Sequence, residues 1–198
     1  ATLSGIPAGA TILDALLYYA ASGSTVDSVV TLDAVSLTAD RTWQSSITTG
    51  STTYDYFGGF KDITAQVSAR PDPNGLYTFT DLAVNNGDPW CKGNEVLGGW
   101  SIFVIYEEAS LSAKALVLYD GFDIDDNSNT NFLLSGIFAS APPEAKTSFL
   151  VWGGTDQLNT GNEGIRFNGT SLSDDRTGPY QCPQDRGQRL RHDQSTHV

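Results

Sequence analysis

The sequence predicts an all-β fold: an antiparallel β-sandwich, jelly-roll-like, with a polar C-terminal tail. Short runs of β-branched and aromatic residues recur along residues 1–175, and clusters of Gly, Pro, Asn and Asp separate them. No amphipathic helix of useful length is evident, and the spacing of the runs is typical of sandwiches and jelly rolls. With 198 residues, 39% of them hydrophobic, the chain can bury the core of one large domain.

The first expected strands lie before residue 60. Ile12–Ala21 is apolar and ambiguous between strand and helix by periodicity, but its two adjacent tyrosines favour a strand. Val26–Leu37 alternates between apolar and polar residues, as a half-buried strand does. Residues 38–59 are rich in Thr, Ser and Tyr, which predicts a long decorated loop or edge strands.

The later strands follow a strong turn signal at residues 70–75, Arg-Pro-Asp-Pro-Asn-Gly. Trp100–Glu107 is apolar on both faces, which predicts a central, doubly buried strand with Ala113–Tyr119 as its neighbour. The remaining expected strands are Leu76–Leu82, Asn131–Ala139, Thr147–Trp152 and Ile165–Phe167.

The last stretch, residues 176–198, differs in composition from the rest. It carries four arginines against two aspartates, so its net charge is +2. Residues 1–175 have a net charge of −14, which gives −12 for the whole chain. Few of its residues are apolar, so it is expected to be a tail that follows a β-sandwich domain of residues 1–175.

The acidic charge excludes some partners. Residues 1–175 have no basic footprint of the kind that displaces phosphate counterions, so we expect no nucleic acid partner. No apolar run is long enough to span a membrane, so no membrane insertion is expected. The chain starts at Ala1 without Met, which fits signal-peptide cleavage or a trimmed boundary. An extracellular or cell-surface location is therefore expected.

The two cysteines, Cys91 and Cys182, are expected to form a disulfide, because secreted chains favour pairing of an even count. Closing so long a loop would stabilise the fold by roughly 4–5 kcal/mol in the chain-entropy description. Two unpaired inert thiols, or a reactive or metal-binding pair, are the alternatives.

No catalytic device is recognisable, so the protein is not expected to be an enzyme. Both histidines, His192 and His197, lie in the polar tail, where an imidazole is not held beside a nucleophile. Glu107 and Glu108 are adjacent in a strand, so their side chains should point to opposite faces rather than form an acid/base pair. There is no phosphate loop, nucleophile elbow or zinc spacing.

One acidic segment is a candidate calcium loop, because its oxygen-bearing side chains alternate as calcium ligands do. It is not an EF-hand, since Ser128 replaces the turn glycine and Leu134 the final glutamate. A looser calcium site and a plain polar hairpin loop are both open. The candidate ligands are Asp120, Asp123, Asp125, Asn127 and Asn129.

Aromatic residues in turn-rich segments are candidates for stacking on sugar rings. The alternative is that each ring plugs an end of the sandwich core. The candidate ligand-binding residues are Trp43, Tyr54, Tyr56 and Trp90, with Phe57 beside them. Asn168-Gly169-Thr170 is a glycosylation sequon, which places a candidate sugar acceptor at Asn168.

Several segments in order resemble a family of uncharacterised bacterial and archaeal cell-surface domains, a domain of unknown function. Together they cover roughly residues 5–175, and they are IPAGAT (6–11), LYY (17–19), DIT (62–64), GLYT (75–78), GWSIFVIYE (99–107), LYDGF (118–122), LSG (134–136) and FNGTSLSD (167–174). The resemblance implies an extracellular β-sandwich without known catalytic residues. The chain departs from this pattern after Asp175, where the arginine-bearing tail replaces strand-forming sequence.

These observations predict an extracellular structural or adhesive surface module. A sandwich that lacks a final strand exposes an unpaired edge, which a neighbouring copy can fill by strand addition. Its expected partners are other copies of itself or surface proteins. The alternative function is a calcium-assisted carbohydrate-binding module with glycans as partners, and a hydrolase with a carboxylate pair ranks last.

Overall fold

The structure is a computed structural model that describes residues 1–93, 95–124, 131–136, 150, 152, 166–168 and 170–171. The chain is all-β, as predicted: its described strands pair antiparallel in every sheet. The helices in the described residues are short, α1 (Thr64–Ser68) and α2 (Trp90–Gly93). None of the described helices is long and apolar enough to cross a membrane.

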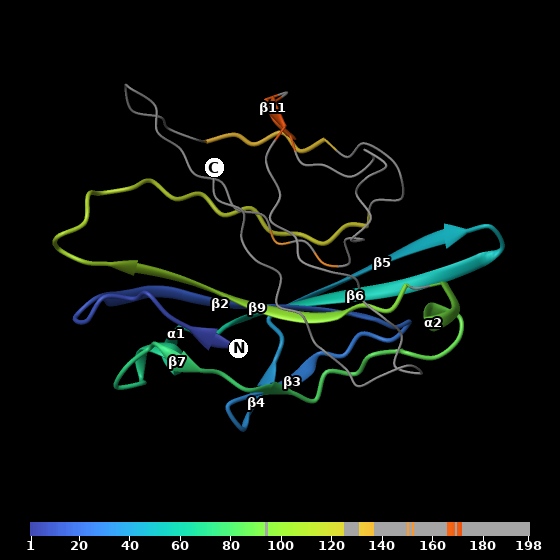
Figure 1. Cartoon of the computed structure of the whole chain (residues 1–198), viewed down its shortest axis with the longest axis horizontal. Coiled ribbons are helices and arrows are strands. Elements are labelled where there is room, and N and C mark those ends of the chain that lie inside the picture. Colours follow the sequence, from blue (N-terminus) through green and yellow to red (C-terminus); the bar gives the residue numbers. More distant parts are fainter. Residues whose placement is uncertain are drawn as a thin grey trace.

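The main sheet has four strands in the order β5-β6-β2-β9 (Figure 1). Its two inner strands are β2 (Thr11–Ser22) and β6 (Thr52–Asp62), and its two edge strands are β5 (Arg41–Thr49) and β9 (Gly98–Glu107). A bulge at Leu13 interrupts the pairing of β2 with β9, since Ile12 faces Tyr106 and Asp14 faces Ile105. The strand predicted from Ile12–Ala21 is therefore confirmed.

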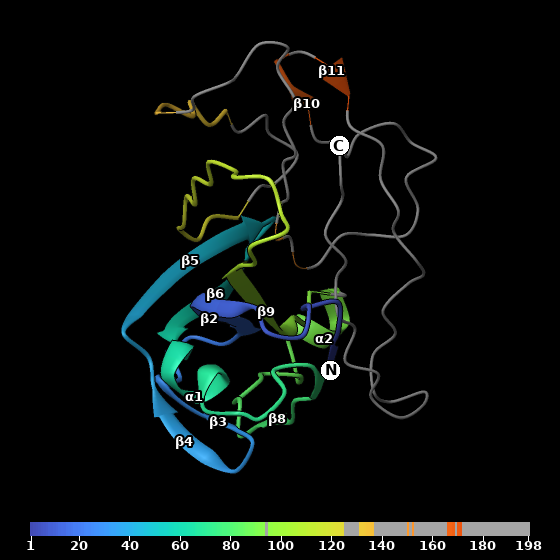
Figure 2. The same ribbon diagram turned by 90° about the vertical axis from the view of Figure 1, so that its left-hand side faces the viewer.

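A smaller layer covers one side of the main sheet, together with α1 (Figure 2). It contains a three-stranded sheet in the order β4-β3-β8, formed by β3 (Val29–Leu32), β4 (Val35–Thr38) and β8 (Phe79–Thr80). A separate two-stranded sheet joins β1 (Thr2–Leu3) to β7 (Gly75–Leu76). Further along the chain, β10 (Arg166–Phe167) and β11 (Thr170–Ser171) form a hairpin. The jelly-roll order of the strands stays a prediction.

The larger core lies between the two layers because β2 alternates its side chains. Ala15, Leu17, Tyr19 and Ala21 are fully buried on one face of β2. They pack with residues of β3, β6, the N-cap of α1, α1 itself and the segment before β8, namely Val30, Leu32, Phe57, Ile63, Val67 and Tyr77. This arrangement excludes water from the face of β2 that carries these side chains.

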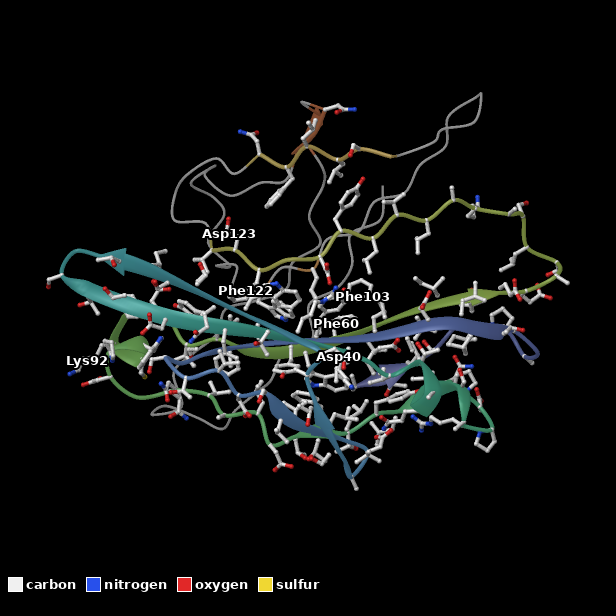
Figure 3. The ribbon with its side chains drawn as sticks, turned by 180° about the vertical axis from the view of Figure 1, so that it is seen from behind. Asp40, Phe60, Lys92, Phe103, Phe122 and Asp123 are labelled. Carbon is white, nitrogen blue, oxygen red and sulfur yellow. The ribbon has the colours of Figure 1, made fainter. Side chains whose placement is uncertain are left out.

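The opposite face of the main sheet carries a second apolar cluster. Leu16, Tyr18 and Phe60 are buried there, with Trp43 and Phe103 packed against them. The segment that follows β9 covers this face, because a Cβ on Gly58 would lie 2.9 Å from the ring of Phe122. Figure 3 shows Phe60, Phe103 and Phe122 on the same side of the sheet.

Several predicted strands differ from the structure. Ala113–Tyr119 and the described part of Asn131–Ala139 form no strand, and Leu116 to Tyr119 are exposed. A strand needs a hydrogen-bonded neighbour as well as β-forming residues, and no described strand pairs with these segments. Of Thr147–Trp152, only residues 150 and 152 are described, and neither is in a strand.

The segment Leu76–Leu82 is not one continuous strand. It is divided between β7, which pairs with β1, and β8, which pairs with β3. The chain changes partner at Tyr77, whose side chain is 1% exposed in the larger core and whose hydroxyl donates to the Pro73 carbonyl. The strand predicted at Ile165–Phe167 is confirmed by β10. The predicted domain boundary at residue 175 lies outside the described residues.

Candidate functional site

The two edges of the main sheet are the first candidate for function. β9 was predicted to be central, but it pairs with β2 alone among the described strands and lies at one edge of the sheet. β5 lies at the other edge and pairs with β6 alone in the same part of the chain. Within the described part of the chain, each edge therefore leaves backbone N–H and C=O groups available to a further strand.

β9 has few of the features that usually protect an exposed edge. Its side chains are apolar on both faces, with Trp100, Ile102 and Val104 toward the larger core and Phe103 toward the second cluster. Between Gly98 and Tyr106 it contains no charged residue and no proline, and its one charge is Glu107 at the end. Natural edge strands are usually protected by lysine, proline or inward charges.

The described residues also form a shallow polar hollow of about 260 Å³ beside the β5–β6 ladder. Gln44 and Ser46 of β5 stand on the same face as Asp55 of β6, because Ser46 pairs with Asp55 and Gln44 with Phe57. The residues lining the hollow are Ser24, Gln44, Ser45, Ser46, Asp55 and Tyr56.

Two hydrogen bonds hold the loop at Ser24 against this part of the sheet. The Gln44 side-chain Nε2 donates to the Ser24 carbonyl at 3.1 Å, and the Gly23 N–H donates to the Asp55 carbonyl at 2.9 Å. The Asp55 carboxylate itself has no hydrogen-bond partner in the described part of the chain. It is therefore a carboxylate acceptor at the wall of a polar hollow.

Three of the predicted sugar-stacking aromatics gather around α2. The Tyr56 hydroxyl donates to the Glu95 carbonyl at 2.8 Å, and the Trp90 indole N–H donates to the Asp55 carbonyl at 3.3 Å. Tyr54 lies under Gly93, where a Cβ would be 2.5 Å from the Tyr54 hydroxyl. Tyr54 and Tyr56 are buried, so their rings hold α2 against β6 and offer no open face for stacking.

The environment of Tyr56 keeps its phenol protonated. Burial, followed by the charge of Glu95 and a hydrogen bond to it, raises the pKa of Tyr56 well above its usual value of 10. The next residue, Phe57, has its side chain on the opposite face of β6, where it is 1% exposed in the larger core. The structure therefore brings Tyr54, Tyr56 and Trp90 together, but as packing groups beside the hollow.

Trp43 lies apart from these rings, on the second apolar face. It packs against the cluster of Leu16, Tyr18 and Phe60, and the guanidinium of Arg41 lies 5.9 Å from its ring centroid. The same guanidinium lies 4.2 Å from the ring centroid of Phe60. Trp43 is thus part of a cation–aromatic contact at the start of β5.

The predicted calcium ligand Asp120 already has a cationic partner in the structure. Its carboxylate pairs with Arg41 and accepts a hydrogen bond from the Tyr18 hydroxyl at 3.4 Å. Asp123 accepts a hydrogen bond from the Ile124 N–H at 2.8 Å. Asp125, Asn127 and Asn129 lie outside the described residues, and no metal-binding group of three is found among the residues the structure does describe. The calcium loop stays a prediction.

The predicted glycosylation site and the predicted disulfide lie at two other places in the chain. Asn168 is exposed at the tip of the β10–β11 hairpin with φ +48°, a left-handed conformation that asparagine tolerates. Cys91 lies in α2, and Cys182 lies outside the described residues. The glycosylation of Asn168 and the pairing of Cys91 with Cys182 therefore remain predictions.

The carboxylates at the end of β9 have separate surroundings. Glu107 is exposed, whereas the Glu108 carboxylate accepts a hydrogen bond from the Ser110 N–H at 3.0 Å and closes the turn that follows the strand. His192 and His197 lie outside the described residues. The geometry of Glu108 thus indicates a local structural role.

Sequence reasoning missed Ser24, Gln44, Ser46 and Asp55 as a group. Gln44 and Ser46 alternate along β5, which is the one signal that they share a face. Their contact with Asp55 depends on the register of the β5–β6 hairpin, and their contact with Ser24 depends on the path of a loop. The local sequence pattern contains neither of these.

Comparisons with known proteins give no relative for this chain. No family model, no curated protein and no solved structure matches it. The resemblance to surface domains of unknown function therefore stays a prediction from the sequence, and the function has to be argued from the site itself.

Proposed function

We propose that this protein is an extracellular structural or adhesive module of a cell surface, and that copies of it associate by strand addition. The observation that carries the proposal is the position of β9. An apolar ten-residue strand lies at a sheet edge with no second strand partner among the described residues. Such an edge is a template for another strand.

The strand that we propose to fill this edge is β5 of a second copy. All neighbouring strands of the main sheet are antiparallel, so β5 and β9, at opposite edges of four strands, run in opposite directions. A second copy in the same orientation therefore presents its β5 antiparallel to β9. The two strands match in length, with nine residues in β5 and ten in β9.

When this contact repeats from copy to copy, it occupies both edges of the main sheet that the described strands leave unpaired, whereas pairing of β9 with β9 of another copy would leave β5 open. In the full-length register, Arg41 at the start of β5 faces Glu107 at the end of β9, which pairs opposite charges. A head-to-tail contact of this kind is heterologous and leads to a ring or an open filament.

The experiment blocks each edge separately. Thr42→Lys with Thr49→Lys places charges on exposed positions of β5, and Ile105→Lys places one on β9, with Tyr106→Lys as a second β9 variant. Ser36→Lys with Thr38→Lys on the exposed β4 strand is the control for the β5 variant, since it changes the net charge equally.

Sedimentation velocity and light scattering are expected to show a mass that grows with concentration for the wild type and the control. Each blocked variant is expected to be monomeric, and an equimolar mixture of the β5 and β9 variants should form dimers that grow no further. A wild type that stays monomeric at high concentration, or dimers of the β5 variant by itself, would overturn the head-to-tail proposal.

A further inference from the structure

The polar hollow beside the β5–β6 ladder is a feature that assembly through backbone edges does not use. Strand addition uses the N–H and C=O groups in the plane of the sheet, whereas Gln44, Ser46 and Asp55 project from its face. Its lining includes the side chains of Gln44, Ser46 and Asp55 on one face of the ladder, together with Ser24, Ser45 and Tyr56. We infer that this hollow binds a neutral carbohydrate, a function beyond the proposed assembly.

The groups of the hollow match the chemistry of sugar hydroxyls. A sugar hydroxyl both donates and accepts, and it can donate to the Asp55 carboxylate while it accepts from a serine hydroxyl. The Gln44 amide is oriented by the bond from its Nε2 to the Ser24 carbonyl at 3.1 Å, which leaves its Oε1 as an acceptor. Hydrogen bonds to an ionised group are stronger than neutral ones, so Asp55 is expected to dominate.

Other ligand classes fit the hollow less well. A phosphate or sulfate would be repelled by Asp55 and by a chain whose net charge is −12. A calcium ion needs several oxygen ligands, usually with more than one carboxylate, and Asp55 is the single carboxylate among the described residues that line the hollow. An apolar ligand would leave the carboxylate and the hydroxyls unpaired.

The size of the hollow limits the ligand to a short stretch of glycan. Sites for drug-sized ligands have volumes of about 300–1,000 Å³, and this hollow has about 260 Å³. It therefore suits one or two sugar units of a longer chain. Trp90 is half-buried, and its indole N–H donates to the carbonyl of Asp55, a residue of the hollow, at 3.3 Å.

The test measures sugar binding on protein that cannot assemble. The Ile105→Lys variant is applied to an immobilised panel of neutral and uronic-acid oligosaccharides, once with calcium and once with EDTA. Amide NMR shifts are then followed with cellobiose, maltose and N,N′-diacetylchitobiose. Saturable binding of a neutral sugar in both buffers is expected, with the shifts centred on Ser24, Ser46 and Asp55.

Asp55→Asn and Gln44→Ala are expected to weaken this binding about tenfold or more, while Thr38→Ala on β4 leaves it unchanged. A blank panel with no amide shifts would overturn the inference. Binding that survives both variants, or that shifts residues elsewhere, would also overturn it. Because the protein is kept monomeric, either result is independent of whether copies assemble.

Discussion

Tyr18 illustrates how a single residue links the main sheet to the segment that follows β9, at the second apolar face. Its ring lies 5.1 Å from the ring centroid of Phe60 and 5.8 Å from that of Phe103. Its hydroxyl donates to Asp120, whose carboxylate is also the partner of Arg41. An apolar ring and a hydrogen-bonded hydroxyl on one side chain thus tie the sheet to the segment that follows β9.

Three tyrosines are held in their neutral form by the fold, because burial raises the pKa of each. Burial, followed by the Asp120 carboxylate, raises the pKa of Tyr18 to about 12, and burial, followed by the charge of Asp27, raises that of Tyr19 to about 12. The pKa of Tyr56 is raised further still. A raised tyrosine pKa means that the folded state holds the neutral phenol more firmly than the unfolded state does.

The stability from these tyrosines is fully present below pH 10 and is lost as the pH rises from 10 through about 12. Absorbance titration should therefore show that Tyr18, Tyr19 and Tyr56 ionise only above pH 10, together with unfolding. Tyr18→Phe should lower the amplitude of this high-pH ionisation by one tyrosine. Ionisation of Tyr18, Tyr19 and Tyr56 near pH 10, with the fold intact, would contradict this.

At the scale of elements, the pairing of β2 with β6 depends on a glycine. Tyr19 faces Gly59 across the two strands, and its ring occupies the space that a side chain at Gly59 would need. The Tyr19 hydroxyl then donates to the Asp27 carbonyl at 3.0 Å, while the Asp27 carboxylate accepts from the Ala83 N–H at 2.8 Å. The packing of the Tyr19 ring over Gly59 thus lets its hydroxyl connect the main sheet to the segment that leads into β3.

Gly59→Ala is therefore expected to destabilise the fold by about 1–3 kcal/mol, because overpacking a filled core forces neighbours to move. A Cβ at residue 59 would lie 2.1 Å from the Tyr19 Cζ. Gly87→Ala is the matched control, since no atom lies within 4 Å of the Cβ that it adds. Chemical denaturation checks the pair, and equal stability of the two variants would refute the role of Gly59.

At the scale of the whole molecule, α2 is where several segments meet. Tyr56 and Trp90 hydrogen-bond across the boundary between β6 and α2, and Ser22 at the end of β2 donates its backbone N–H to the Leu97 carbonyl at 2.9 Å. Cys91 lies within this junction. A bond from Cys91 to Cys182 would fasten the polar tail to the end of the main sheet.

Peptide mapping without reduction is expected to recover Cys91 and Cys182 in one linked fragment that separates after reduction. Removing both thiols with Cys91→Ser and Cys182→Ser should lower the free energy of unfolding by roughly 4–5 kcal/mol, the value for a long closed loop. The same double variant should match the stability of reduced wild type. Recovery of both cysteines as separate alkylated peptides from the unreduced protein would contradict the pairing.

The sequence by itself determined the all-β class, the strand within Ile12–Ala21, the strand Trp100–Glu107 and the strand at Phe167. These follow from local alternation, β-branched and aromatic side chains and turn residues, which act over a few neighbouring positions. The apolar faces of β9 were also visible in the sequence, but their pattern does not distinguish a central strand from an edge strand.

Only the tertiary structure decided which strands meet. It placed β9 at an edge, divided residues 75–80 between two partners, and brought Ser24, Gln44, Ser46 and Asp55 into one hollow. It also showed that Tyr54 and Tyr56, which were predicted to stack on sugars, are buried and pack against α2. The physical reason is that these outcomes depend on strand register and on contacts between distant segments, which local composition does not specify.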